Sequence, residues 1–144
     1  MSDSDRQKAP ERPLPAPEDE LNAQFWEHCG SGKLCFQRCT QCGAWRHLPR
    51  FLCADCGSGE WQWEESSGRG CIYTWTVTHQ APMQAFAGAT PYAAVVVELE
   101  EGVRLVSGVR DLQPNELSIG LPVEVVFEPV SETMLIPLFR RRST

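Results

Sequence analysis

Four regularly spaced cysteines are the residues of this sequence best suited to chemistry. Cys39 and Cys42 form one CxxCG knuckle, and Cys53 and Cys56 form a second. Two thiolates three residues apart can reach one tetrahedral ion, and the glycine after each pair permits the positive φ that turns backbone amides towards sulfur. Two buried cysteine pairs or two disulfides are the alternatives. The near-identical sequences CTQCG and CADCG favour a zinc ribbon.

The expected zinc ion is structural, because four thiolates fill a tetrahedral coordination sphere and leave no position for water or substrate. Iron is the other metal to consider, since CxxCG pairs also hold iron in rubredoxins, and a red protein would reveal it. The motif therefore predicts a zinc-ribbon architecture and does not indicate a reaction.

Composition limits the partners and the compartment. The chain has 13 basic and 19 acidic residues and a net charge of −6, so it lacks the basic surface that nucleic acid phosphates require. It contains no apolar run that could span a membrane and no hydrophobic signal segment. Seven cysteines, four of them in metal spacing, fit a reducing compartment. We therefore expect a cytoplasmic protein without a membrane partner, and expect Cys29, Cys35 and Cys71 to be small buried apolar residues.

The N-terminal part divides into a tail and a helix. Residues 1–17 are rich in proline and charge and are expected to form a disordered tail. Residues 18–32 predict a helix with acidic residues at its start, Leu21, Phe25 and Cys29 on one face, and glycines at its end. This face, widened by Trp26, could pack on the chain's own domain or dock on a partner.

The rest of the chain predicts a mainly β protein. Residues 33–66 are assigned to the zinc ribbon, with strands at 33–37 and 45–49, and residues 67–144 to an OB-fold. Alternating residues predict five barrel strands, at 71–79, 92–100, 103–110, 123–128 and 135–140. Cys71, Tyr73 and Trp75 are expected on the buried face of the first. Five strands with a short helical turn after the third match a small Greek-key barrel of the OB type.

The residues offer little for catalysis. His28, His47 and His79 lie far apart in the sequence and outside any metal-binding spacing, and no glycine-rich phosphate loop follows a strand. A single histidine at a strand end, such as His79, is more often a structural residue than a general base. The sequence therefore favours a non-catalytic binding module over an enzyme.

The interval 80–91 between the first two barrel strands is unusual because it has no charge. It carries Met83 and Phe86 among small residues, with a proline near each end. Such a loop either folds back on the barrel or is covered by a partner or ligand, and we favour the second alternative.

The order of these motifs resembles a known family. The matching features are Phe25-Trp26, Gly32-Lys33-Leu34, the segment from Gln37 to Gly43, Pro49-Arg50, the second CxxCG knuckle, Gly68-Arg69-Gly70, the threonine-rich strand to His79, and Pro91-Tyr92. In this order they resemble the acyl-CoA-associated family that joins an N-terminal helix and a rubredoxin-like zinc ribbon to a C-terminal OB-fold. The resemblance covers the chain from Leu21 to Arg140.

The resemblance implies an accessory role and a partner. It assigns structural Zn²⁺ to the four knuckle cysteines and no catalytic residue to this chain. Family members accompany thiolase-fold large subunits, in acyltransferases or in lyases such as aldolases that act on CoA thioesters, including those of steroid-like side chains. We therefore expect an α2β2 complex in which this subunit completes the acyl-CoA channel. Candidate interface residues are Phe25, Trp26, Met83, Phe86 and Tyr92. The alternatives are a zinc-ribbon/OB nucleic-acid-binding protein and a subunit of an acyl-CoA hydratase.

Overall fold

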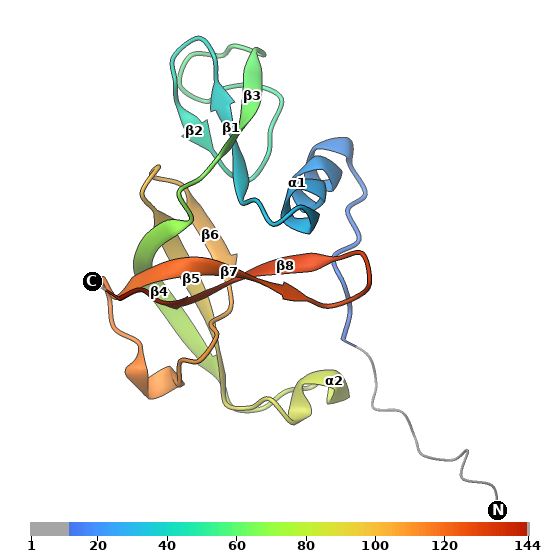
Figure 1. Cartoon of the computed structure of the whole chain (residues 1–144), viewed down its shortest axis with the longest axis vertical. Helices are drawn as coiled ribbons and strands as arrows, with labels where there is room; N and C mark the ends of the chain where they lie inside the picture. The colour runs from blue at the N-terminus through green and yellow to red at the C-terminus, as the bar shows by residue number, and fades with distance from the viewer. Residues whose placement is uncertain (1–11, 144) are drawn as a thin grey trace, which may run out of the picture.

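The computed structural model describes residues 12–143 and contains two antiparallel sheets and one main helix (Figure 1). The helices are α1 (Glu20–Gly30), the single turn α2 (Gln84–Ala87) and the 3-10 turn η2 (Pro114–Glu116). The strands are β1 (Cys35–Cys39), β2 (Trp45–Arg46), β3 (Trp61–Glu65), β4 (Arg69–Thr78), β5 (Tyr92–Leu99), β6 (Arg104–Ser107), β7 (Pro122–Pro129) and β8 (Leu135–Arg141). The predicted fold class, mainly β with an N-terminal helix, a ribbon and an OB-type barrel, is confirmed.

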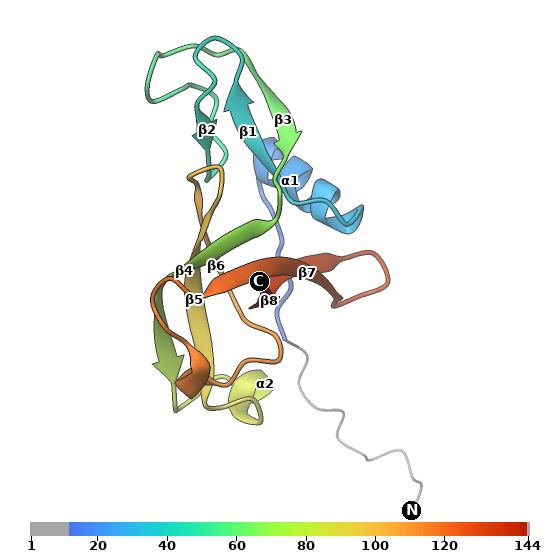
Figure 2. The same ribbon diagram turned by 60° about the vertical axis from the view of Figure 1, so that its left-hand side comes forward.

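Helix α1 is capped by Asp19, whose carboxylate accepts a hydrogen bond of 2.9 Å from the Asn22 N–H. Its apolar face buries Leu21, Phe25 and Cys29 within the chain. The helix contacts β1 and β8 and therefore bridges the two sheets (Figure 2). Of the two alternatives for this face, packing on the chain's own domain is the one observed.

The ribbon sheet has the strand order β2-β1-β3. Strand β1 begins at Cys35, two residues later than predicted, and runs into the first knuckle at Cys39. Strand β2 is only two residues long, because the chain leaves the sheet before Pro49, which has no N–H to give to a ladder. The predicted strand at 45–49 was therefore too long.

The larger sheet has the order β6-β5-β4-β7-β8 and closes on itself. A parallel bridge joins Val109, just beyond β6, to Phe139 of β8. Two hydrogen bonds hold this closure: Arg110 N–H donates to the Phe139 carbonyl at 2.8 Å, and Phe139 N–H donates to the Gly108 carbonyl at 3.1 Å. Closure of a five-stranded sheet between its third and fifth strands is the topology of an OB barrel.

A bulge in β4 changes which side chains face the barrel interior. Ile72 pairs with Val97 and Thr74 with Val96, so Tyr73 is an extra residue without a partner. Ile72 is fully buried, whereas Tyr73 is 43% exposed. The prediction that Cys71 and Tyr73 share the buried face was wrong, since one extra residue moves the preceding part of the strand to the opposite face.

One hydrophobic core joins the helix, the ribbon and the barrel. Phe25 and Phe36 belong to the same buried cluster as Val95, Val123 and Phe139. The ribbon therefore rests on the barrel through its base, while its knuckles project away from it (Figure 1).

Part of the predicted N-terminal tail lies against the barrel. Arg12 donates a hydrogen bond of 3.2 Å to the Ala85 carbonyl, and its guanidinium lies 4.7 Å from the centre of the Phe86 ring. The rest of the predicted tail, residues 1–11, lies outside the described residues. The uncharged interval 80–91 contains the turn α2 and is thus locally folded. Within residues 12–143, no helix is long and apolar enough to cross a membrane.

Candidate metal centre and its surroundings

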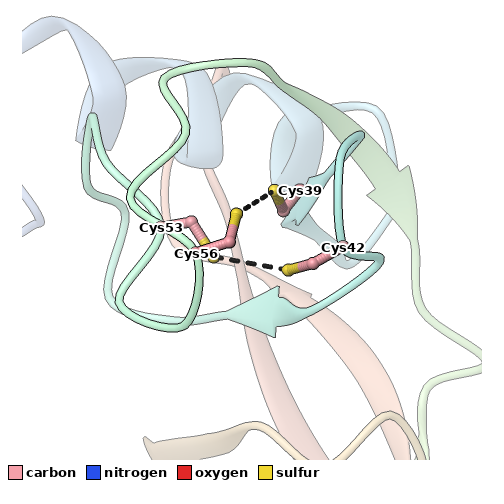
Figure 3. A group of neighbouring side chains, drawn as sticks. All are labelled: Cys39, Cys42, Cys53 and Cys56. Carbon is pink, nitrogen blue, oxygen red and sulfur yellow. Dashed lines mark hydrogen bonds between the residues drawn. The ribbon is translucent and has the colours of Figure 1, made fainter.

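The four knuckle cysteines converge on one point from two loops (Figure 3). The sulfur atoms of Cys39 and Cys56 are 3.6 Å apart, as are those of Cys42 and Cys53, and all four lie within 4.8 Å of one another. Tetrahedral zinc with Zn–S bonds of about 2.3 Å would separate its sulfur ligands by about 3.8 Å. The donor set and its spacing therefore fit a structural zinc ion.

Backbone N–H groups stabilise the thiolate form of the first cysteine in each knuckle. The N–H groups of Cys42 and Gln41 donate to the Cys39 sulfur and lower the pKa of Cys39 to about 6, against an opposing contribution from burial. Those of Cys56 and Asp55 lower the pKa of Cys53 in the same way. The turns that aim these amides need positive φ at the next residue, and the φ of Gly43 is 78° and that of Gly57 is 77°.

Four protein sulfurs would complete the coordination of the ion. Cys39 and Cys53 are buried and Cys42 and Cys56 are exposed, so one side of the site faces the protein and the other faces solvent. A tetrahedral ion held by four thiolates has no open position to bind or activate a substrate. This centre can stabilise the ribbon, and its donor set gives it no means of catalysis.

A buried polar network beside the knuckles was not predicted from the sequence. The Gln37 side-chain oxygen accepts from Arg46 Nε at 2.9 Å and from the Arg50 N–H at 2.7 Å. Arg46 Nη2 also donates to the Arg50 carbonyl at 2.6 Å. Gln37 is 0% exposed and Arg46 is 6% exposed. The network ties the chain that leaves β2 back onto β1, across the register pair Gln37 and Arg46.

The structure separates the predicted interface residues. Phe25 is only 3% exposed and lies in the core, so it is not available to a partner. Trp26 is partly buried against that core. At the other end of the barrel, Met83 is 50% exposed, and the Phe86 and Tyr92 rings lie 6.0 Å apart. Met83, Phe86 and Tyr92 therefore lie at or beside α2 and the start of β5, whereas Trp26 lies on α1. Helices α1 and α2 are well separated (Figure 1).

A groove of about 510 Å³ runs between α1, the ribbon and the barrel. Its lining is mainly apolar and includes Trp26, Leu48, Val106, Pro137 and Leu138. The N-terminal segment lies along it through Pro13 and Pro15. The groove is thus an apolar hollow beside the predicted helix surface that carries Trp26.

The histidines do not assemble a catalytic site. The His47 ring lies 5.1 Å from the Phe25 ring and 5.2 Å from the Phe36 ring, and burial lowers the pKa of His47 to about 4. The His28 ring lies 5.4 Å from Trp63. Within the described part of the chain, the four knuckle cysteines are the only cluster of three or more metal-ligating side chains. Burial also raises the pKa of the Cys29 thiol to about 12, which makes it unreactive.

Comparison with known proteins agrees with this architecture. Residues 26–62 match the family model of the ChsH2 rubredoxin-like zinc ribbon domain, and residues 63–128 match that of the ChsH2 C-terminal OB-fold domain. A chain of a solved structure described as an Ltp2-ChsH2(DUF35) aldolase is 35% identical and superposes with a TM-score of 0.80. That alignment covers 88% of this chain and 98% of the other.

Two relatives differ in length. A DUF35 domain-containing scaffold protein of Methanocaldococcus jannaschii is 33% identical over 117 residues, which is 79% of this chain and 82% of that protein. A probable enoyl-CoA hydratase alpha subunit of Thermomonospora curvata is 36% identical over 129 residues, which is 90% of this chain but only 40% of that protein. The chain thus spans about two fifths of the hydratase subunit. With both ChsH2 family models matched in succession and most of a DUF35 relative covered, the chain belongs to the DUF35 family of ChsH2-type zinc-ribbon and OB-fold proteins.

Proposed function

We propose that this chain is an accessory, non-catalytic subunit of a thiolase-like enzyme that acts on CoA thioesters. The observation that carries the proposal is its likeness, at 35% identity and over 98% of the matched chain, to a chain of the Ltp2-ChsH2(DUF35) aldolase. Among the possible reactions of such a complex we favour aldol cleavage of a carbon–carbon bond, with the side chains of steroid-like CoA thioesters as substrates. Acyl transfer is the alternative within this class.

The chemistry of the chain supports the accessory role. The zinc centre has a filled coordination sphere, and the residues with shifted pKa values serve structure. Glu100 has a lowered pKa because it accepts from Arg69, and Asp19 has a lowered pKa because it caps α1. An accessory chain of this kind raises the rate of its partner by excluding water and by holding a flexible thioester in a productive geometry.

The apolar groove and the α2 surface are the two places where such a role can be exercised. The groove beside Trp26 is apolar and has a volume of about 510 Å³, which suits it to cover part of an acyl chain. The surface formed by Met83, Phe86 and Tyr92 suits contact with the large subunit. Thiolase-fold enzymes act as dimers, so one accessory chain on each protomer gives an α2β2 complex with two-fold symmetry. We place this complex in the cytoplasm.

A hydratase is the second candidate function. It is favoured by the 36% identity to the probable enoyl-CoA hydratase alpha subunit, in which the matched region is 40% of the protein. In this alternative the chain accompanies a hydratase active site supplied by another polypeptide, and the metal centre is again structural.

Reconstitution with purified proteins distinguishes these functions. The chain is mixed with the thiolase-fold protein of the same organism or with its acyl-CoA hydratase, and the mass of each mixture is measured by native mass spectrometry. We expect a two-plus-two complex with the thiolase-fold protein and no complex with the hydratase. A stable complex with the hydratase alone would support the second function and contradict the first.

A further inference from the structure

The loop between β2 and the second knuckle exposes an unusual amount of apolar surface. We call residues 47–52 the inter-knuckle loop. Leu48 is 68% exposed, Phe51 is 69% exposed and Leu52 is 62% exposed, so three large apolar side chains project from five consecutive positions. Single exposed apolar residues are ordinary on protein surfaces, whereas a contiguous group marks an interaction site.

The inter-knuckle loop is held in place by the chain beneath it. The Gln37 oxygen accepts from the Arg50 N–H, and Arg46 Nη2 donates to the Arg50 carbonyl, so both backbone polar groups of Arg50 are bonded to buried side chains. The loop ends at Cys53, a ligand of the metal centre. The Leu52 side chain also lies against Gly59. A surface that is already ordered loses little conformational entropy when it binds.

Among residues 12–143, no carboxylate compensates the charge of Arg50 on the inter-knuckle loop. Arg38, Arg69, Arg104 and Arg140 each form an ion pair with a glutamate. No carboxylate among residues 12–143 lies within ion-pair distance of Arg46 or of the exposed Arg50. Arg46 Nη1 is buried and has no hydrogen-bond partner in this range. The loop therefore combines apolar side chains with an arginine, Arg50, that has no ion-pair partner among the described residues, on a chain whose net charge is −6.

We propose that the inter-knuckle loop is a docking element for the thiolase-fold large subunit, which offers an apolar socket with a carboxylate at its rim opposite Arg50. This inference rests on the proposed function and adds to it the surface and the chemistry of the contact. Phe51 is the anchor, because exposed aromatic side chains that enter a pocket contribute most to such interfaces. The carboxylate pairs with Arg50 and steers association.

Other occupants fit the charge pattern less well. In a two-fold contact between two copies of this loop, Arg50 would face its symmetry mate, and the loop contains no acidic residue to separate them. A nucleic acid or an anionic membrane needs several cations. Arg38 is paired with Glu64 and Arg46 is buried, so Arg50 is the one exposed arginine of residues 33–66 without an ion-pair partner in the described part of the chain.

The test measures the affinity of the purified full chain for the thiolase-fold large subunit by biolayer interferometry. We expect Phe51→Asp to weaken binding about tenfold or more, because it places a charge in an apolar socket. Arg50→Glu is expected to slow association and to reduce its dependence on salt. The matched control is Ile119→Asp, since Ile119 is 77% exposed on a turn of the barrel, and this variant is expected to bind within about twofold of the parent chain.

Zinc content and circular dichroism establish that each variant is folded. If the parent chain binds and Phe51→Asp binds equally well, the docking element is refuted and the proposed function stands. If the parent chain does not bind the large subunit at all, both fail. Flotation with vesicles containing phosphatidylserine tests the remaining outcome. If the parent chain binds the vesicles and Phe51→Asp does not, the loop inserts into membranes and the proposal is overturned.

Discussion

His47 should make the stability of the protein depend on pH in a predictable direction. Its ring packs against both Phe25 and Phe36, and its Nδ1 atom is buried without a hydrogen-bond partner among the described residues. Burial disfavours the charged imidazolium and lowers the pKa of His47 from 6.5 to about 4. Above pH 6.5 the residue is neutral in both the folded and the unfolded chain, so it imposes no penalty on folding.

The loss of stability occurs as the pH falls from 6.5 to 4. In this window the unfolded chain binds a proton at His47 and the folded chain does not, so the proton stabilises the unfolded state. Each unit of pKa difference corresponds to about 1.4 kcal/mol, so the full effect is about 3.4 kcal/mol, of which about 2 kcal/mol is lost by pH 5. Below pH 4 both states bind the proton and the loss stops growing.

The assay compares the parent protein with His47→Leu, which has no titrating group and fills the aromatic site with an apolar side chain. The free energy of unfolding is measured with urea at pH 7 and pH 5, following tryptophan fluorescence, on zinc-loaded samples. Because protonation of the cysteines weakens the zinc site equally in both proteins, the comparison between them isolates His47. The parent protein should lose about 2 kcal/mol more than the variant between the two pH values. Equal losses would show that His47 is hydrated in the folded protein and that its burial does not lower its pKa.

Three further predictions concern the metal centre, the barrel and the α2 surface. Cys42→Ser should abolish zinc binding and expose the amides of residues 39–60 to hydrogen exchange, while β4 to β8 stay protected. The reason is that a structural zinc contributes about 10 kcal/mol or more to the folding of a small module. A zinc-free variant whose ribbon amides stay protected would contradict this prediction. Gly70→Ala should destabilise the barrel by about 1–3 kcal/mol, because the added Cβ would overlap the Glu98 carbonyl. The control is Gly88→Ala, whose added Cβ has no atom within 4 Å, and it should leave the thermal unfolding temperature unchanged. Phe86→Asp should weaken association with the large subunit. It should keep the fold and the zinc, since the new carboxylate can pair with Arg12. Co-purification of this variant with the large subunit at the yield of the parent chain would show that Phe86 does not lie in the interface.

Features encoded by neighbouring residues were predictable from the sequence. The spacing of the four cysteines and the glycines that follow them placed the metal centre, because a CxxCG knuckle is a complete local unit. The acidic start and the i, i+4 apolar residues placed α1. Alternation placed the barrel strands, since each buries one face.

Features that depend on pairing between distant segments were not predictable. The bulge at Tyr73 is set by the register of β4 against β5, which alternation within one strand does not reveal. The bond between Gln37 and Arg46 depends on the register of the ribbon hairpin, and the contact of Arg12 with α2 joins residues more than seventy positions apart. Phe25 was placed at an interface because periodicity identifies an apolar face without saying which surface covers it. The inter-knuckle loop was missed for a related reason, since the sequence does not show that its apolar residues stay exposed.

The measurement that tests the accessory role most directly is the turnover of a β-hydroxyacyl-CoA thioester by the chain alone, by the thiolase-fold large subunit alone and by their mixture. We expect no cleavage by the chain alone, because its metal centre is closed and its described residues include no assembled acid, base or nucleophile. We also expect the mixture to turn over the thioester much faster than the large subunit does by itself. Cleavage by the purified chain alone at about 1 s⁻¹ or faster, an ordinary enzymatic rate, would show that the chain is itself an enzyme and not an accessory subunit.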